Sequence, residues 1–361
     1  MFKTILTAAF AALTIASSAQ SDSASVYLQK GLEEKNRGRR MESLKHFEKA
    51  YAYSKTSREV VGELAEAYFD LRRYAQAREK YREFEKLGDR SAVTYRQLMT
   101  ISYNLRQFED AIQYAQQLKK VQPTEKTAYY AGKSYYALED LGNAIRHLEI
   151  AGKEDEQNAD IPYTIARAYI DMQNYKQALP HFQKAVAVNP DNARWHYELA
   201  LMFYAMTDDQ NSLKHMLIAA EKGMKKDVEF LQNLATAYLN AGKFNEGMAT
   251  LHELLQKRPS DISLIGSIAE ACYNNKKYNE AITYYDQLLT LDQKNAEALY
   301  MIGMSYQKMG DKQKGMALCD KAIEMDPSLK SLKQEKKLPG LSAVKLIGTQ
   351  RNSRVFNPGF P

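Results

Sequence analysis

Residues 160–190 read DIPYTIARAYIDMQNYKQALPHFQKAVAVNP, and this stretch decides the fold. Within it, Ala166 and Ala178 lie 12 residues apart, Phe182 comes four residues after Ala178, and Pro190 closes the segment. Small residues where two antiparallel helices cross let the backbones approach, and a larger residue four positions on fills the adjoining space. Proline ends a helix and presets the turn that follows. The stretch therefore predicts an antiparallel pair of helices with a defined end.

The same pattern recurs along the chain at intervals of 33 to 35 residues. The residues equivalent to Ala178 are Ser43, Ala77, Ala111, Ala144, Ser212, Gly247, Ala281 and Gly315, so the pattern occurs nine times. Those equivalent to Ala166 are Gly31, Ala65, Met99, Gly132, Ala200, Ala235, Ala269 and Gly303. One helix pair cannot bury its apolar face alone, so successive pairs must stack. Residues 24–328 are therefore predicted to form one all-α solenoid.

Composition agrees with a helical protein and argues against a nucleic-acid partner. The 361 residues include only 9 Pro and 17 Gly, so few positions break a helix. The net charge of +6 is mild and dispersed, whereas nucleic-acid binders carry a dense basic stripe. We expect no nucleic-acid partner.

The first residues have the features of a secretory signal peptide. Lys3 supplies a positive start, residues 4–16 are uncharged and mostly apolar, and Ser17, Ser18 and Ala19 supply small residues before a cut after Ala19. The apolar run is too short to span a bilayer, and no later segment reaches spanning length. Residues 1–19 are therefore predicted to be a signal peptide on an exported protein with no transmembrane segment. The chain has no Asn-x-Ser/Thr sequon, which favours a bacterial envelope over a eukaryotic secretory lumen. The expected location is the periplasm of a Gram-negative bacterium, and the alternative is extracellular.

Cysteine and histidine residues do not predict a chemical site. Cys272 and Cys319 occupy apolar helix positions, so each is expected to be a small buried residue, not half of a disulfide. Four histidines share one place on the second helix of their repeats, namely His46, His147, His181 and His215. Stacked repeats lie roughly 10 Å apart, whereas zinc needs ligands about 2 Å from a shared ion. We expect these histidines to pack or to lie at the surface, with no metal bound.

The sequence also lacks the motifs of common enzymes. It contains no metalloprotease histidine spacing, no glycine-rich phosphate loop before lysine and a hydroxyl residue, and no Gly-x-Ser-x-Gly elbow. Its carboxylates are spread over predicted helix surfaces, where their usual role is solvated charge. We therefore expect no catalytic residues, no cofactor and no enzymatic activity.

The repeated residues resemble the tetratricopeptide repeat (TPR), which has small residues at repeat positions 8 and 20, aromatic residues at 11 and 24, and proline at 32. Position 11 reads Tyr68, Tyr135, Tyr169, Phe203, Tyr238 and Tyr306, and it departs from the pattern at Glu34, Ser102 and Cys272. The resemblance implies a right-handed superhelix of nine repeats. It also implies that the first helix of each repeat lines a concave groove through positions 2, 5, 9, 12 and 13.

Those positions combine tyrosine with arginine and lysine in the third to sixth repeats. Tyrosine offers a large contact area and a polar tip, and cations suit carboxylates or a peptide backbone. Tyrosine at position 12 can also serve packing alone, so the tyrosines at position 5 are the stronger candidates. The predicted partner-binding residues are Arg96, Tyr103, Lys126, Tyr129, Lys133, Tyr136, Tyr163, Arg167, Arg194, Tyr197 and Tyr204.

These features predict a non-catalytic exported scaffold that binds a protein or extended peptide in its groove and supports assembly of an envelope complex. The alternative is a module that binds glycan or peptidoglycan by stacking sugars on the tyrosines. Some TPR co-chaperones hold chaperone tails with a carboxylate clamp, but Arg96, Thr100 and Lys133 do not reproduce its residues.

The end of the repeat array is predicted to need a cover. Residues 329–338 are predicted to form a capping helix, with Leu329 and Leu332 placed against the ninth repeat. Residues 339–361 contain Lys345, Arg351 and Arg354 and no acidic residue, and are predicted to be a flexible basic tail. The alternative is a segment that docks on a partner or folds back on the solenoid.

Overall fold

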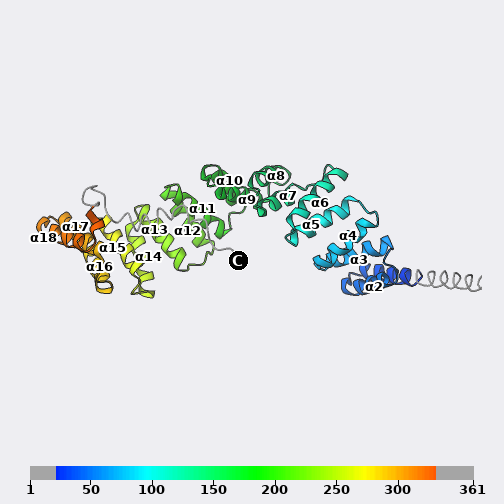
Figure 1. Ribbon diagram of the computed structural model, residues 1–361, viewed down its shortest axis with the longest axis horizontal. Helices are drawn as coiled ribbons and strands as arrows, with labels where there is room; N and C mark the ends of the chain where they lie inside the picture. Colours follow the sequence, from blue (N-terminus) through cyan, green and yellow to red (C-terminus); the bar gives the residue numbers. More distant parts are fainter. Residues whose placement is uncertain (1–21, 331–361) are drawn as a thin grey trace, which may run out of the picture. The chain divides into compact units, whose positions relative to one another are not determined.

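The computed structural model describes residues 22–330, which form helices and turns with no strand among them (Figure 1). The predicted all-α class is therefore confirmed. The predicted signal peptide (1–19) and basic tail (339–361) lie outside the described residues, as does most of the predicted capping helix. Within it, Leu329 belongs to the short 3-10 helix η1 (Pro327–Leu329) and is buried against the last two helices.

The chain forms two compact units, one ending at Met172 and one beginning at Gln173. The first unit holds a helix over 22–36, followed by α2 (Arg40–Tyr53), α3 (Arg58–Asp70), α4 (Tyr74–Lys86), α5 (Ala92–Asn104), α6 (Phe108–Val121), α7 (Ala128–Ala137), α8 (Leu141–Glu154) and α9 (Asp160–Asp171). The second holds α10 (Tyr175–Val188), α11 (Ala193–Ala205), α12 (Asp209–Glu221), α13 (Val228–Asn240), α14 (Phe244–Lys257), α15 (Ile262–Asn274), α16 (Tyr278–Leu291), α17 (Ala296–Met309) and α18 (Lys312–Met325). The boundary falls in the turn between the two helices of the fifth repeat.

Polar residues fix where many of these helices begin. The side chain of Ser57 accepts a hydrogen bond from the Val60 backbone N–H at the start of α3. Asp227 and Asn295 do the same for α13 and α17. Such a cap satisfies one of the backbone N–H groups left over at a helix start and contributes about 1 kcal/mol. The caps therefore set the register of the repeats at the level of local sequence.

The turn between the first and second helix of a repeat, here called the intra-repeat turn, contains a left-handed residue in every repeat. It is glycine in three repeats, at Gly38, Gly242 and Gly310. In the other six it is Arg72, Arg106, Glu139, Gln173, Thr207 or Lys276, with φ between 55° and 62°. A left-handed conformation costs a non-glycine residue roughly 1–2 kcal/mol. The stack therefore imposes the same turn on sequences that differ in how well they suit it.

Small residues allow the two helices of each repeat to approach closely. The residue equivalent to Ala178 is the fourth residue of every second helix and is buried in all nine repeats. A methyl group added to Gly132 would lie 2.7 Å from the Leu148 side chain, and one added to Gly31 would lie 2.4 Å from Phe47. The larger residue at position 24 thus occupies the space that the small residue leaves, as the sequence predicts.

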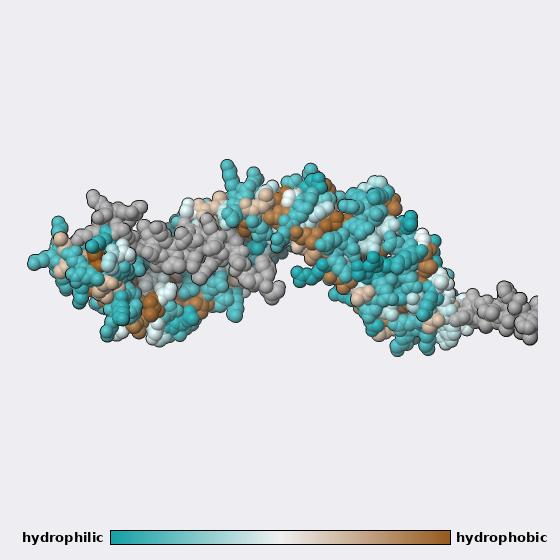
Figure 2. Space-filling view, in the orientation of Figure 1, coloured by the Kyte–Doolittle hydropathy of each residue, from teal (hydrophilic) through white to brown (hydrophobic). Residues whose placement is uncertain are grey.

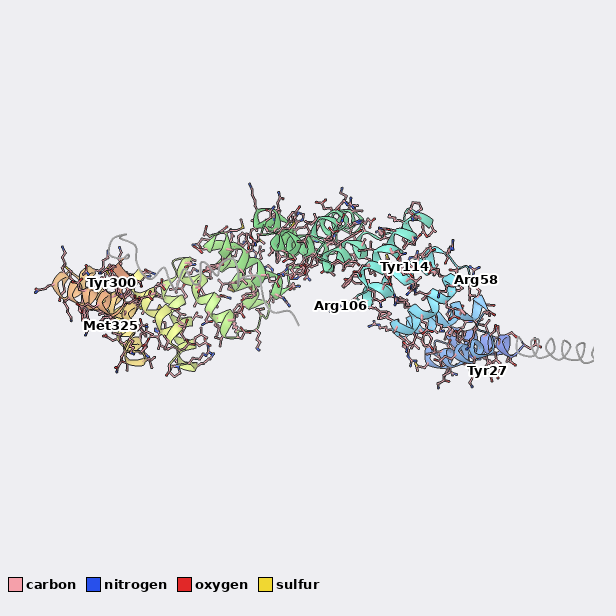
Figure 3. The ribbon with its side chains drawn as sticks, in the orientation of Figure 1. Tyr27, Arg58, Arg106, Tyr114, Tyr300 and Met325 are labelled. Atoms are coloured by element: carbon pink, nitrogen blue, oxygen red, sulfur yellow. The ribbon has the colours of Figure 1, made fainter. Side chains whose placement is uncertain are left out.

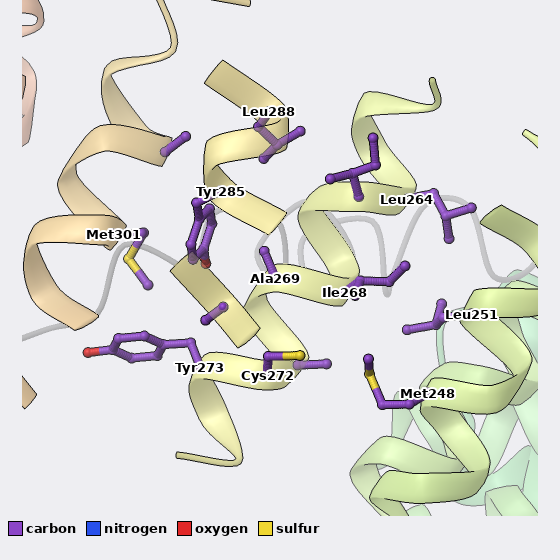
Figure 4. Close-up of a cluster of buried hydrophobic side chains, with 14 of the residues drawn as sticks. Met248, Leu251, Leu264, Ile268, Ala269, Cys272, Tyr273, Tyr285, Leu288 and Met301 are labelled. Carbon is purple, nitrogen blue, oxygen red and sulfur yellow. The ribbon is translucent and has the colours of Figure 1, made fainter. Parts of the chain in front are cut away.

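Larger apolar residues fill the space between successive repeats. In the second unit, one such cluster joins α14, α15, α16 and α17 (Figure 4) and includes Met248, Leu251, Ile268, Tyr285 and Met301. Cys272 is fully buried in the same cluster, and burial raises the pKa of its thiol to about 11. Cys319 is also buried, and neither cysteine forms a disulfide within residues 22–330. Both are small packing residues, as predicted.

We expect Gly132→Ala to destabilise the protein by about 1–3 kcal/mol, because the added methyl group must displace Leu148. Gly142→Ala is the matched control, since Gly142 lies in the other helix of the same repeat and has nothing within 4 Å of the added carbon. It should be neutral or stabilise by up to about 1 kcal/mol. Chemical denaturation followed by circular dichroism measures both. Equal effects would contradict close packing at Gly132.

Candidate functional site

Eight of the eleven predicted partner-binding residues lie in the first unit, on α5, α7, α9 or just before α7. The other three lie on α11 of the second unit, and they are Arg194, Tyr197 and Tyr204. All except Lys126 belong to the first helix of a repeat, as predicted. Figure 2 shows apolar patches among polar surface over α7 and α9 in the first unit. The two groups have different surroundings.

Arg96 joins the third repeat to the fourth. Its Nε and Nη2 atoms donate to the two carboxylate oxygens of Glu125 at 2.7 and 2.8 Å. The hydrogen bond from Arg96 lowers the pKa of the Glu125 carboxyl. Two parallel hydrogen bonds of this kind hold a guanidinium in one orientation. Arg96 is therefore committed to a contact between repeats.

Tyr129 and Lys133 converge on one carboxylate of the next repeat. The Tyr129 hydroxyl and the Lys133 ammonium each donate to Oδ2 of Asp160 at 2.8 Å. Lys133 also reaches the hydroxyl of Thr164 at 3.2 Å. Burial, and secondly the Asp160 charge, raises the pKa of the Tyr129 hydroxyl well above its usual range. The contact is a compact polar group at the start of α9.

Tyr136 of α7, and Lys126 just before it, are also held by hydrogen bonds. The Tyr136 hydroxyl donates to Oδ2 of Asp171 at 2.8 Å, and burial raises the pKa of Tyr136 to about 12. Lys126 lies before α7 and donates to the backbone carbonyl of Glu154 at the end of α8, at 2.7 Å. These residues link the fourth repeat to the end of its own second helix and to the fifth repeat.

Three tyrosines form a cluster on α5 and α7, here called the tyrosine cluster: Tyr103, Tyr129 and Tyr130. The ring centroids of Tyr103 and Tyr130 are 5.3 Å apart, and those of Tyr129 and Tyr130 are 5.6 Å apart, both edge to face. All three side chains are half-buried. The hydroxyls of Tyr103 and Tyr130 have no hydrogen-bond partner in the described part of the chain, and neither is sealed from solvent. The cluster thus offers aromatic area and two available hydroxyls.

In the second unit the predicted residues are more buried. Tyr197 is only 9% exposed; its hydroxyl accepts from Asn233 at 2.7 Å and donates to Glu229 at 3.4 Å. Tyr204 is equally buried, and Arg194 bonds to Glu198 on its own helix at 2.9 Å. Arg167 in the first unit is also buried, at 6% exposed, and Tyr163 is half-buried. Burial of Arg167, Tyr197 and Tyr204 was not evident from their repeat positions.

The acidic partners of these residues were not predicted from the sequence. The residue at position 5 bonds to a carboxylate at position 1 or 2 of the next repeat in three cases: Arg96 with Glu125, Tyr129 with Asp160, and Tyr197 with Glu229. The sequence separations are 29, 31 and 32 residues, close to one repeat length. A search for donors and carboxylates at that separation would have found them.

The equivalently placed histidines contact rings of their own repeats. The stacked pairs are Tyr27–His46, Tyr135–His147 and Phe203–His215, with centroids 6.2, 5.2 and 5.5 Å apart. His215 also meets His196, with their Nδ1 atoms 3.0 Å apart, and burial lowers the pKa of His215 to about 4. No group of three or more metal-ligating side chains occurs within residues 22–330. For these three histidines, packing explains the shared position.

Glu270 on α15 is a buried carboxyl of the second unit and is 9% exposed. It forms no ion pair within the described residues, and its neighbour Glu297 is also acidic. Burial, and secondly the Glu297 charge, raises the pKa of Glu270 to about 7, although a hydrogen bond from Asn274 opposes the shift. The ionised form is therefore disfavoured in the folded state.

The pKa of Glu270 predicts a loss of stability as pH rises. The folded state binds this proton more tightly than the unfolded chain, whose carboxyl has a pKa of 4.5. The free energy of unfolding therefore begins to fall as pH rises above 4.5, and the loss is complete above about pH 7. We expect Glu270→Gln to be more stable than wild type by roughly 2 kcal/mol at pH 8 and nearly equal to it at pH 4.5.

Thermal unfolding at both pH values measures this effect. Glu253→Gln on α14 is the control, because Glu253 is exposed and pairs with Lys257. It should change stability little. Because the hydrogen bond from Lys257 lowers the pKa of Glu253, any loss should be larger at pH 8, which is opposite in sign to the gain expected for Glu270→Gln. A gain for Glu270→Gln that is the same at pH 4.5 and pH 8 would contradict the assignment.

Comparison with known proteins places these repeats in a family. Tetratricopeptide repeat family models match residues 28–92, 135–202, 229–261 and 296–329, and a TPR repeat model matches residues 269–310. Together the matches cover more than half of the chain. Within the described residues, no helix is both long and apolar enough to cross a membrane.

The chain is also similar to individual TPR-containing proteins. It is 27% identical over 206 residues to Hsp70-Hsp90 organizing protein 1 of Glycine max. It is 25% identical over 205 residues to Hsp70-Hsp90 organizing protein 3 of Arabidopsis thaliana. Each match covers 55% of this chain and 35% or 36% of the relative, so the chain spans about a third of their length. Among solved structures, YrrB, described as a TPR protein with an unusual peptide-binding site, is 18% identical over 55% of this chain and 97% of YrrB, with a TM-score of 0.41. The chain belongs to the tetratricopeptide repeat family.

Proposed function

We propose that this protein is a non-catalytic scaffold that binds an extended peptide or protein segment on the first-helix face of its repeats. The observation that carries the proposal is the tyrosine cluster. It combines half-buried aromatic rings with hydroxyls of Tyr103 and Tyr130 that have no partner within residues 22–330. TPR proteins are typically protein-interaction modules, which supports a binding function over catalysis.

The polar contacts around the tyrosine cluster define what it can recognise. The hydroxyl of Tyr129 is held by Asp160, so its ring is fixed in place, whereas Tyr103 and Tyr130 retain the ability to donate and accept. A peptide backbone presents alternating N–H and C=O groups that match such hydroxyls. Fixed aromatic rings add contact area with little loss of conformational entropy on binding. An extended segment therefore fits this surface better than a compact charged ligand.

The named relatives organise Hsp70 and Hsp90, and YrrB binds peptide, but the same partners are not proposed for this chain. Arg96 is the cation that comes nearest to a carboxylate clamp, and one edge of its guanidinium is held by both carboxylate oxygens of Glu125. Lys133 is likewise bonded to Asp160. A chaperone tail would have to displace both contacts, so the partner is proposed to be a different peptide.

The proposed binding can be tested by removing only the available hydroxyls. We expect Tyr103→Phe combined with Tyr130→Phe to weaken partner capture about tenfold, because two hydrogen bonds of about 0.5–1.5 kcal/mol each are lost while the rings remain. Capture is measured by pull-down from envelope extract of the native host, with quantitative mass spectrometry of the bound proteins.

Tyr95→Phe combined with Tyr114→Phe is the matched control. These two tyrosines stack on each other at 6.3 Å, line a cavity of about 420 Å³ with residues of α4 and α6, and also lose two hydroxyls. If both double variants capture the same proteins in the same amounts as wild type, the binding site lies away from the tyrosine cluster. Competition by soluble glycan instead of by peptide would favour the glycan-binding alternative.

The sequence features of the first 19 residues support export, and a role in assembling an envelope complex outside the cytoplasm is part of the proposal. Cleavage after Ala19 would give a mature chain that begins at Gln20. Mass spectrometry of the protein isolated from its host should find that N-terminus in the periplasmic or extracellular fraction. Protein that retains residues 1–19 in the cytoplasmic fraction would exclude this compartment.

A further inference from the structure

Arginine is concentrated in the first three repeats. Eleven of the 15 arginines between residues 22 and 330 lie between residues 37 and 106. That segment holds 16 Lys and Arg against 10 Asp and Glu, a net charge of +6 that equals the charge of the whole chain. Arginine differs from lysine because its planar guanidinium binds phosphate and carboxylate groups through two parallel hydrogen bonds. The concentration therefore suggests a local use for this side chain.

Nine of the eleven arginines fall into two structural groups, and the other two, Arg82 and Arg90, line the cavity beside Tyr95. Those in the first turns or middle of the helices pair with an acidic residue further along the chain: Arg58 with Asp89, Arg78 with Asp110, and Arg96 with Glu125. Six others lie at the intra-repeat turns, and they are called here the arginine edge: Arg37, Arg39, Arg40, Arg72, Arg73 and Arg106. Consecutive helices are antiparallel, so the intra-repeat turns of stacked repeats share one edge of the solenoid.

The arginine edge is exposed and mostly unpaired. Arg37 and Arg39 are about 60% exposed and share one carboxylate, that of Glu34. The other four form no ion pair with any residue of the described chain. Figure 3 shows Arg106 at the margin of the ribbon, at the end of α5. Helix packing thus uses the first group of arginines and leaves the edge available.

Two arginines of this edge can be replaced without loss of backbone stability. Arg72 and Arg106 occupy the left-handed position of their turns, with φ of 55° and 58°, where the first repeat has Gly38. Glycine would fit both places without strain. Glu139, Gln173, Thr207 and Lys276 take the same conformation in other repeats, so the strain belongs to the turn and not to arginine. Replacing Arg72 and Arg106 by glycine therefore removes their charge without adding backbone strain.

Apolar and aromatic side chains accompany the arginines. Met41 follows Arg40 and is 47% exposed. Leu71 and Leu105 directly precede the two left-handed arginines and are half-buried, as are Tyr74 and Phe108 at the starts of the next helices. Cations beside apolar and aromatic groups are typical of surfaces that lie in the headgroup region of a bilayer. A phosphate polymer in water offers nothing to the apolar members of this set.

We propose that the arginine edge binds the phosphate headgroups of an anionic phospholipid bilayer. Clusters of about four to eight basic residues suffice for such binding, and the six arginines span three adjacent turns spaced roughly one helix diameter apart. A broad, flat bilayer surface can meet all three turns at once. The edge adjoins the tyrosine cluster at one place, where the Arg106 backbone N–H donates to the Tyr103 carbonyl at 3.0 Å. The two tests remove different side chains, so one proposal can fail without the other.

The test is cosedimentation of residues 20–361 with vesicles of 30% phosphatidylglycerol in phosphatidylcholine, at low and physiological salt. Residues 1–19 are omitted because their apolar run would itself bind lipid. Wild-type protein should bind the anionic vesicles, bind them more weakly at the higher salt concentration, and not bind vesicles of pure phosphatidylcholine. Arg72→Gly combined with Arg106→Gly should bind about tenfold or more weakly. The same substitutions relieve two strained turns, so the melting temperature of this variant should equal or exceed that of wild type.

Two controls separate the edge from other effects. Lys120→Gln combined with Lys153→Gln removes two exposed cations from the ends of α6 and α8, at the opposite edge of the same unit, and should leave binding unchanged. Thr207→Gly relieves a left-handed residue in the second unit without touching an arginine and should also leave it unchanged.

Three results would overturn the proposal. The first is failure of wild type to bind anionic vesicles. The second is binding by the Arg72→Gly, Arg106→Gly variant that equals that of wild type. The third is a loss of binding in the Lys120→Gln, Lys153→Gln variant as large as that in the Arg72→Gly, Arg106→Gly variant. Binding of polyglutamate or single-stranded DNA through the same arginines, without vesicle binding, would reassign the edge to an acidic protein or a nucleic acid.

Discussion

The close approach of two backbones at the crossing point within each helix pair is the constraint on which the other features depend. A methyl group added to Gly315 would lie 2.5 Å from the Gly303 carbonyl oxygen, and the Ser43 hydroxyl donates to the Gly31 carbonyl at 2.9 Å. Contacts this short leave no room for a side chain larger than serine or alanine at most of these crossings. They fix the distance between helices, and position 24 then fills the space beside them.

A fixed helix pair brings the same positions of neighbouring repeats into contact. Position 5 of one repeat meets position 1 or 2 of the next, which is why Arg96 finds Glu125 and Tyr129 finds Asp160. The face predicted to bind a partner is therefore also the face that joins the repeats. Hydroxyls that remain available, such as those of Tyr103 and Tyr130, are the ones that this joining does not use.

Different parts of the chain meet the demands of stacking in different ways. The second and third repeats accept left-handed arginines at their turns. The second unit instead buries a carboxyl, Glu270, that has an acidic neighbour and no ion pair within residues 22–330. Both features lower stability, and a repeat array tolerates them because its stability is spread over many similar interfaces. Such local departures are where a repeat protein differs from others with the same fold.

The sequence by itself determined the helix pairs, their number and their packing face, because small residues at crossing points and a period near 34 residues are local and repeated signals. It also placed ten of the eleven candidate residues on first helices, and it placed Cys272 and Cys319 in the interior. Only the tertiary structure decided which candidates keep an available polar group. Tyr129 and Tyr197 look equivalent at position 5, yet the first is half-buried and the second is 9% exposed and bonded on both sides of its hydroxyl. The reason is physical: the exposure of each ring depends on how closely it packs against the next repeat, as Tyr197 does against Phe230, and the repeat pattern does not encode that packing.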